Sequence, residues 1–143
     1  MEKKMKIGYT QGCFDMFHVG HLNLLNNARS QCDYLIVGVN SDALMESYKH
    51  KTPVICEEFR KTIVENIKAV GEAHIVNTLD KLEILDSIAY DVIFIGDDWR
   101  GSERWNATTD ALKKRGIDVV FLPYTQNVSS SLLREKKDDK VEE

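Results

Sequence analysis

Two histidines stand three residues apart in the segment GCFDMFHVGH, directly after a short apolar run near the start of the 143-residue chain. This spacing places His18 and His21 on one face of a helical first turn, and Gly20 between them lets a ligand approach the backbone. The free N–H groups and the positive dipole end of a helix start favour an anion. Two imidazoles beside these donors therefore predict a receptor for phosphate oxygens.

Other interpretations of these histidines remain open. Taken singly, each would more often be a surface or core-rim residue without a chemical role. A metal site would need a third ligand or an H-E-x-x-H pattern, and neither accompanies the pair. The H-x-G-H spacing at a strand-to-helix turn favours the phosphate receptor. His50 and His74 lie outside this pattern, and we assign them no role.

A second group of charged residues follows the second predicted strand. Lys49 and Lys51 stand two residues apart in a segment with little helical or strand pattern, between Asp42 and Arg60. An irregular loop there would bring two ammonium groups to one phosphate cluster, where each acts as a point charge. A solvated basic loop without a ligand is the alternative.

Two later strand ends also carry residues suited to a site. The segment 96–99 reads GDDW, which offers an indole face for stacking. A serine cluster at 129–131 predicts a helix N-cap, whose hydroxyls and free N–H groups suit phosphate oxygens. Simple capping, without a ligand, explains the serines equally well.

The elements that must position these residues alternate between strand and helix. Continuous apolar runs such as YLIVGVN and DVIFI are typical of strands covered on both faces. The alternation predicts an α/β fold: one Rossmann-like, doubly wound domain with a five-stranded parallel sheet, whose ligand binds beyond the carboxyl ends of the strands. We expect strands at 6–10, 34–40, 73–76, 91–95 and 118–122, and helices at 19–30, 57–69, 80–89, 106–115 and 129–135.

Apolar residues at helical spacing predict which face of each helix is buried. Gly116 should end the helix at 106–115, because glycine adopts the left-handed conformation that follows many helices. The expected buried positions are Leu22, Leu25 and Ala28 in the first helix, Phe59, Ile63, Ile67 and Val70 in the second, and Leu82, Leu85 and Ile88 in the third.

Composition narrows the class of protein. The length suits one domain, which we place at 1–134, followed by a nearly all-charged tail at 135–143. A net charge of −4 argues against a nucleic-acid partner. No apolar run is long enough to insert into a membrane, and the N-terminus is not a signal peptide. Three cysteines without a C-x-x-C pair favour a reducing, cytoplasmic location.

The motifs together carry a resemblance to a known family. From about residue 6 to residue 134 the chain resembles the cytidylyltransferases of the H-x-G-H nucleotidyltransferase superfamily, and within them the bacterial glycerol-3-phosphate cytidylyltransferases. The segments GCFDMFHVGH and DYLIVGVNSD are also similar to ethanolamine-phosphate cytidylyltransferases. The resemblance implies transfer of CMP from CTP to a small alcohol phosphate, by default glycerol 3-phosphate, giving a CDP-alcohol and pyrophosphate. It further implies a homodimer, and we expect Mg²⁺ bound mainly through CTP, without a protein metal site.

The resemblance also implies roles for individual residues. Catalysis is expected from His18, His21 and Lys51. Acceptor contacts are expected from Asp42, Lys49, Arg60 and Lys81. Nucleotide contacts are expected from Gly12, Cys13, Phe14, His18, Gly20, His21, Lys51, Lys68, Gly96, Asp98, Trp99, Thr125, Ser129 and Ser130.

Three positions depart from the family pattern. Lys68 and Tyr124 stand where the family has arginine, and Asn127 stands where it has glycine. The missing guanidinium beside the triphosphate leaves open a nucleotide-binding protein with weakened catalysis. An adenylyltransferase with FMN or a heptose phosphate as acceptor is a further alternative, although GDDW resembles the glycerol-phosphate branch.

Overall fold

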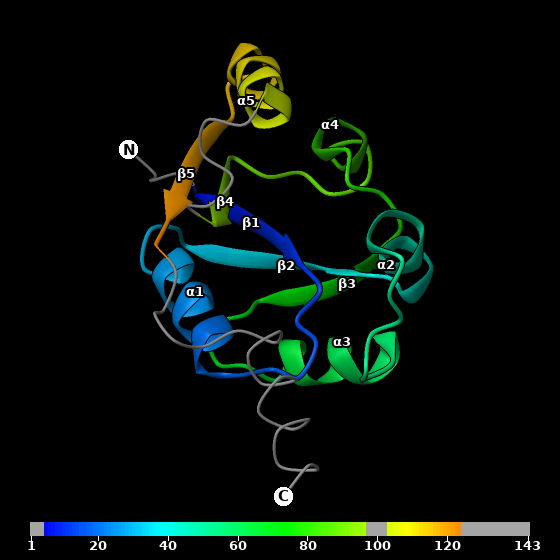
Figure 1. Cartoon of the computed structure of the whole chain (residues 1–143). Coiled ribbons are helices and arrows are strands. Elements are labelled where there is room, and N and C mark those ends of the chain that lie inside the picture. Colours follow the sequence, from blue (N-terminus) through cyan, green and yellow to red (C-terminus); the bar gives the residue numbers. More distant parts are fainter. Residues whose placement is uncertain (1–4, 97–102, 124–143) are drawn as a thin grey trace, which may run out of the picture.

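The computed structural model describes residues 5–96 and 103–123, and within them the strands form one parallel five-stranded sheet. The spatial order is β3-β2-β1-β4-β5, with every neighbouring pair parallel. The predicted α/β class and parallel sheet are confirmed (Figure 1). The strands are β1 (Ile7–Gly12), β2 (Tyr34–Asn40), β3 (Glu72–Val76), β4 (Val92–Gly96) and β5 (Asp118–Leu122).

Helices cover both faces of this sheet (Figure 1). Alternate side chains of β2 show why: Leu35 and Val37 pack into one buried cluster with Leu25 of α1, whereas Ile36 packs into a second cluster. The first cluster lies under α1 (Val19–Arg29) and α3 (Glu57–Glu65). The second lies under α4 (Lys81–Ile84) and α5 (Glu103–Lys114), while α2 (Asp42–Lys49) follows β2. The sheet is therefore doubly wound, as predicted.

The strand order places a topological switch point between β1 and β4. The chain runs from β1 outward to β2 and β3, then crosses back to β4 on the other side of β1. In such sheets the crevice beyond the carboxyl ends at the switch point binds ligands. Gly12 ends β1 and Gly96 ends β4, so the predicted site residues after these strands begin at the same edge.

A glycine and a tyrosine interlock inside the sheet. Tyr9 of β1 is fully buried, stacks on Tyr90 with ring centroids 5.0 Å apart, and donates a hydrogen bond to Gln11. Its hydroxyl would lie 2.1 Å from a Cβ added at Gly38 of β2. Residue 38 must therefore be glycine while residue 9 is tyrosine.

Several helix predictions need correction. The helix expected at 57–69 ends at Glu65, and its buried face is turned: Arg60 and Val64 face inward, whereas Phe59 and Ile63 are 66% and 39% exposed. The reason is tertiary, since the guanidinium of Arg60 is drawn into a buried network described below. By contrast, α1 starts and ends within one residue of prediction and buries Leu25 and Ala28.

Other element boundaries also differ. The segment expected to be irregular forms the helix α2, capped by Ser41, whose hydroxyl accepts the N–H of Leu44. The helix expected at 80–89 is a short α4 that buries Ile84, and α5 begins at Glu103, three residues before prediction. Gly116 has a φ of +80° just after α5, as predicted. The expected helix at 129–135 and the tail at 135–143 lie outside the described residues.

Candidate active site

A cleft of about 610 Å³ opens at the switch point. Its floor is the carboxyl end of β1 and β4, including Gly12 and Gly96, and its walls come from the turn after β1, from α1, from the segment around α2, and from α4 and α5. Eight residues of the predicted site line it: Gly12, Cys13, Phe14, His21, Lys49, Lys51, Lys81 and Gly96. Residues distant in sequence thus meet where the fold predicts a ligand.

The two histidines build the start of α1 themselves. His18 is the N-cap, and its Nδ1 accepts the backbone N–H of Gly20 at 3.0 Å. His21 reaches back, so that its Nδ1 accepts the backbone N–H of His18 at 3.3 Å. This is the reciprocal arrangement of a capping box, made here with imidazoles. The rings stack with centroids 3.9 Å apart.

These hydrogen bonds determine which ring nitrogen carries the proton. An Nδ1 that accepts an N–H has no proton, so the neutral ring is protonated on Nε2. Burial lowers the pKa of His18, and burial together with the neighbouring His18 lowers the pKa of His21 to about 4, against an opposing effect of Asp15. Near neutral pH both rings are therefore uncharged and offer Nε2–H donors.

The two lysines of the second group lie on either side of a helix end. Lys49 is the last residue of α2, with its ammonium 5.9 Å from the ring centroid of Tyr48, and Lys51 follows in a loop. His50 between them adopts the left-handed conformation, with φ 56°. Both lysines are exposed and line the cleft. The chain turns at His50, and Lys49 and Lys51 on either side of it both line the same cleft.

Lys81 of α4 also lines the cleft. It is 8% exposed at the first position of α4, and its ammonium donates to the carbonyl of Leu79 at 2.7 Å. The same ammonium lies 5.5 Å from the ring centroid of Trp105 in α5. Such a cation–π contact holds the charge in place without neutralising it. Lys81 is thus a fixed cation within the cleft.

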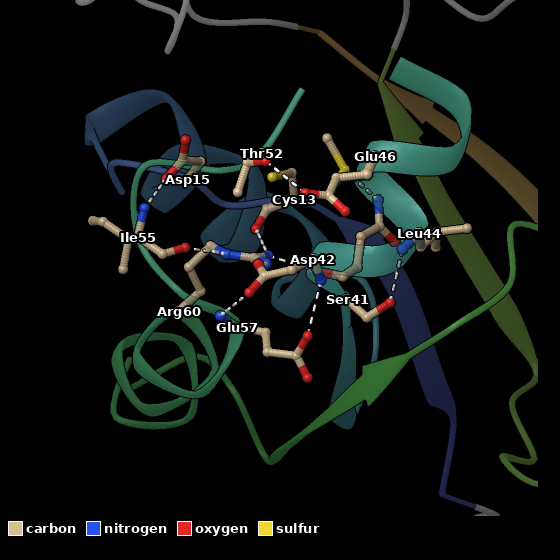
Figure 2. A network of polar contacts seen from close by, with 12 residues as sticks. Cys13, Asp15, Ser41, Asp42, Leu44, Glu46, Thr52, Ile55, Glu57 and Arg60 are labelled. Atoms are coloured by element: carbon tan, nitrogen blue, oxygen red, sulfur yellow. Dashed lines mark hydrogen bonds and ion pairs between the residues drawn. The ribbon is translucent and has the colours of Figure 1, made fainter. Parts of the chain in front are cut away.

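Arg60 and Asp42, for which we predict contacts with an acceptor, belong to a buried polar network beside the cleft. They form an ion pair at 2.5 Å, and the fully buried guanidinium also donates to three backbone carbonyls (Figure 2). The carbonyls belong to Ile55, Cys13 and Asn40, at 2.8, 2.7 and 2.7 Å. Neither charged residue lines the cleft. Within the described residues, Arg60 and Asp42 connect the segments that form the cleft. Their direct contact with an acceptor stays a prediction.

Not every other predicted site residue reaches the cleft. Lys68 is exposed beyond the end of α3 and does not line it. His18 and Gly20 do not line it either, although His18 is stacked on His21, which does. Asp98, Trp99, Thr125, Ser129 and Ser130 lie outside the described residues, as do Tyr124 and Asn127.

Sequence reasoning missed three residues of this region. Asp15 is 3% exposed and lines the cleft, and its carboxylate accepts two backbone N–H groups. Gln11 lies in the floor, where its amide donates to Asn40 and to the carbonyl of Thr78. Trp105 of α5 also lines the cleft. An aspartate between the apolar residues Phe14 and Met16, in the turn after β1, was a signal for the first, whereas the other two depend on tertiary contacts.

Within residues 5–96 and 103–123, no three histidine, cysteine or acidic side chains are grouped so that they could hold a metal ion. The described helices include none with the length and apolar character to cross a membrane. All three cysteines are described, and no disulfide joins them.

Comparison with known proteins adds independent evidence. The chain is 36% identical over 131 residues to the glycerol-3-phosphate cytidylyltransferase of Bacillus spizizenii, covering 91% of this chain and 95% of that protein. It is 32% identical over 130 residues to the bifunctional protein HldE of Hyphomonas neptunium, covering 90% of this chain and 26% of HldE. The chain therefore spans about a quarter of that longer relative.

A solved structure supports the fold. The lipopolysaccharide core biosynthesis protein from Thermoplasma volcanium matches with a TM-score of 0.71 at 24% identity, covering 87% of this chain and all of that one. The profile of the family described as Cytidylyltransferase-like matches residues 9–136, which runs from within β1 through β5. The H-x-G-H turn, the doubly wound sheet and this match over most of the sequence together establish that the chain belongs to the cytidylyltransferase-like family.

Proposed function

We propose that this protein transfers CMP from CTP to a small alcohol phosphate, with glycerol 3-phosphate as the first candidate, and releases pyrophosphate. The observation that carries the proposal is the single cleft at the switch point, which His21, Lys49, Lys51 and Lys81 all line. Three ammonium groups and a donor imidazole suit two phosphorylated substrates better than one. The similarity to a glycerol-3-phosphate cytidylyltransferase over 91% of the chain supports the choice of acceptor.

The reaction requires no covalent enzyme intermediate. An oxygen of the acceptor phosphate attacks the α-phosphorus of CTP in line, a new P–O bond forms, and the bond to the bridging oxygen breaks. Pyrophosphate leaves with that electron pair. The protein contributes by holding the two anions in line and by stabilising the charge on the phosphoryl oxygens.

Each imidazole and each ammonium group has an assigned part in this scheme. The Nε2–H groups of His18 and His21 donate to oxygens of the α-phosphate and leaving group, because their Nδ1 atoms are occupied by the backbone. Lys51 holds the triphosphate, while Lys49 of α2 and Lys81 of α4 bind the acceptor phosphate. Neutral donors suit this task, since they can strengthen their hydrogen bonds as charge develops without giving up a proton.

Mg²⁺ fits this site as a companion of the nucleotide. The described lining of the cleft is rich in nitrogen donors, and it holds no group of three ligands for a cation. Phosphate oxygens and water would therefore supply most of the coordination. When bound, Mg²⁺ would neutralise charge on the triphosphate.

An adenylyltransferase is the second candidate, because HldE is similar over 90% of this chain. The test is incubation of the protein with Mg²⁺, each of four nucleoside triphosphates and a panel of alcohol and sugar phosphates, with products identified by mass. We expect a CDP-alcohol. An ADP-sugar or adenylated flavin would establish the alternative, and tight CTP binding without any product would indicate a binding protein.

We also propose that the protein acts in the cytoplasm as a homodimer. The absence of disulfides among its three cysteines supports a reducing compartment. Exposed Phe59 and Ile63 on α3 supply apolar surface for a second copy. Light scattering on the purified protein measures the mass, and a monomer at micromolar concentration would contradict the dimer.

A further inference from the structure

Asp15 is a buried charged residue of the cleft that the scheme above does not use. Its exposure is 3%, and its two carboxylate oxygens accept the backbone N–H groups of Val54 and Ile55, each at 2.9 Å. The residues on either side of it, Phe14 and Met16, have φ values of 55° and 49°. Two non-glycine residues in the left-handed region, separated only by Asp15, are costly, so strong contacts must fix the turn that carries this carboxylate.

Arg60 closes a ring with the same turn. Its Nε donates to the carbonyl of Ile55, and one of its terminal nitrogens donates to the carbonyl of Cys13, two residues before Asp15. Both polar groups of the Ile55 backbone are thus held by buried side chains of opposite charge, as Figure 2 shows. The chain from Cys13 to Asp15 completes the ring covalently.

The loop at 50–55 depends on these side chains. In the described part of the chain, no backbone-to-backbone hydrogen bond involves residues 51–55. At its start the loop is also tied to Glu46: the backbone N–H of His50 donates to the carbonyl of Glu46 at 3.1 Å, and the hydroxyl of Thr52 donates to its carboxylate at 2.6 Å. The carboxylate of Asp15 therefore replaces the backbone pairing that would otherwise fix the loop. Lys51 is carried on this loop into the cleft.

We propose that Asp15 is a positioning residue for nucleotidyl transfer: it fastens the 50–55 loop to the turn after β1, so that Lys51 faces the same phosphate as His21. The proposal rests on the proposed function and assigns Asp15 no contact with substrate. It explains why a carboxylate lies buried at a site for polyanions, since its charge is taken up by two N–H donors. The effect of Asp15 on activity should therefore depend on the presence of Lys51.

A double-mutant cycle between Asp15→Asn and Lys51→Ala tests this coupling. An asparagine keeps the size of the side chain but accepts one N–H with its oxygen and opposes the other with its own NH₂ group. In the wild-type background we expect Asp15→Asn to raise KM for CTP about tenfold, as for loss of a hydrogen bond to a charged group. In the Lys51→Ala background the same change should raise KM by less than about twofold.

Tryptic cleavage after Lys51 provides a readout of the loop itself. Asp15→Asn should accelerate this cleavage, while Asp91→Asn should not. Asp91 is a matched control, because its half-buried carboxylate accepts the N–H of Ile7 at 2.9 Å far from the cleft. Thermal unfolding of both variants reports any general loss of structure, and the cleavage measurement requires no enzymatic activity.

The outcomes separate the two proposals. If the wild-type protein forms no nucleotidyl product, the proposed function fails, and cleavage still tests whether Asp15 holds the loop. If the wild type is active but the two substitutions are additive, or the cleavage rate of Asp15→Asn equals that of the wild type, the positioning role is overturned. A raised Mg²⁺ requirement with unchanged KM would instead make Asp15 a metal ligand, which also overturns it.

Discussion

The helices α1 and α3 pack on the same face of the sheet, yet their core residues and their site residues are arranged differently. In α1 the apolar residues Leu25 and Ala28 face the core, and the proposed chemistry lies at its N-terminal histidines. In α3 the inward face carries Arg60 beside Val64, so the side chain that organises the cleft also occupies the core. Stability and function should therefore be separable in α1 and coupled in α3.

The largest effect on activity is expected from the chemical end of α1. His21→Ala removes an Nε2–H donor from the phosphate, and turnover should fall roughly 10²- to 10³-fold, as for the loss of an oxyanion-hole donor. The free energy of unfolding should fall by only about 1 kcal/mol, because the ring contributes a helix cap and contacts with Phe14 and Phe17. Turnover by a pyrophosphate-release assay, compared with calorimetry, measures both. A variant that keeps most of its activity would remove His21 from the scheme.

The core end of the same helix should show the opposite pattern. Leu25→Ala leaves a cavity at a fully buried site and should lower the free energy of unfolding by about 3 kcal/mol. KM and turnover, measured well below the unfolding temperature, should stay near wild type. Denaturant titration gives the stability. A large kinetic defect in the folded variant would show that core packing and activity are not separable in α1.

Arg60→Lys tests the coupling in α3. Lysine keeps the charge but cannot donate at once to Asp42 and to three carbonyls. We expect a loss of about 2 kcal/mol in unfolding free energy, together with a rise in KM for CTP. Denaturant titration and steady-state kinetics on one preparation check this. A loss of stability without a rise in KM, or the reverse, would contradict the coupling in α3.

The pH dependence of stability sharpens the account of the α1 histidines. The pKa of His21 is lowered from 6.5 to about 4, so the unfolded chain binds a proton that the folded chain refuses between these values. Stability should thus be full above pH 6.5 and should fall as the pH drops towards 4, by roughly 1–2 kcal/mol once the partial exposure of the ring is allowed for. Denaturant titrations of wild type and His21→Ala at pH 7 and 4.5 measure the difference, which a flat wild-type profile would contradict.

The outward face of α3 should give the smallest effect on stability. Phe59→Ser removes an exposed ring and should change the unfolding free energy by no more than about 0.5 kcal/mol. If two copies associate here, light scattering should show a shift towards monomer. A destabilisation comparable to that of Leu25→Ala would mean that this ring is buried after all.

The sequence predicts well those elements that can pack against any apolar surface. Buried strands such as 34–40 and the stripe of α1 need only an apolar environment, and the H-x-G-H turn is specified locally. The face of α3 could not be predicted, because Arg60 finds carbonyls 5, 20 and 47 residues away. Gln11 and Trp105 were missed for the same reason, since their partners are set by tertiary packing. Residues after β4 and β5 that complete the predicted site lie outside the described residues.

The interlock of Tyr9 with Gly38 has a consequence for anyone who redesigns or diversifies this sheet. A methyl group at position 38 demands that the phenol be shortened or removed, and a smaller residue at position 9 leaves a void against Tyr90 and frees Gln11 from its hydroxyl donor. The two positions should thus tolerate joint replacement far better than either single one. In a library built on this scaffold, surviving variants should carry paired changes at 9 and 38.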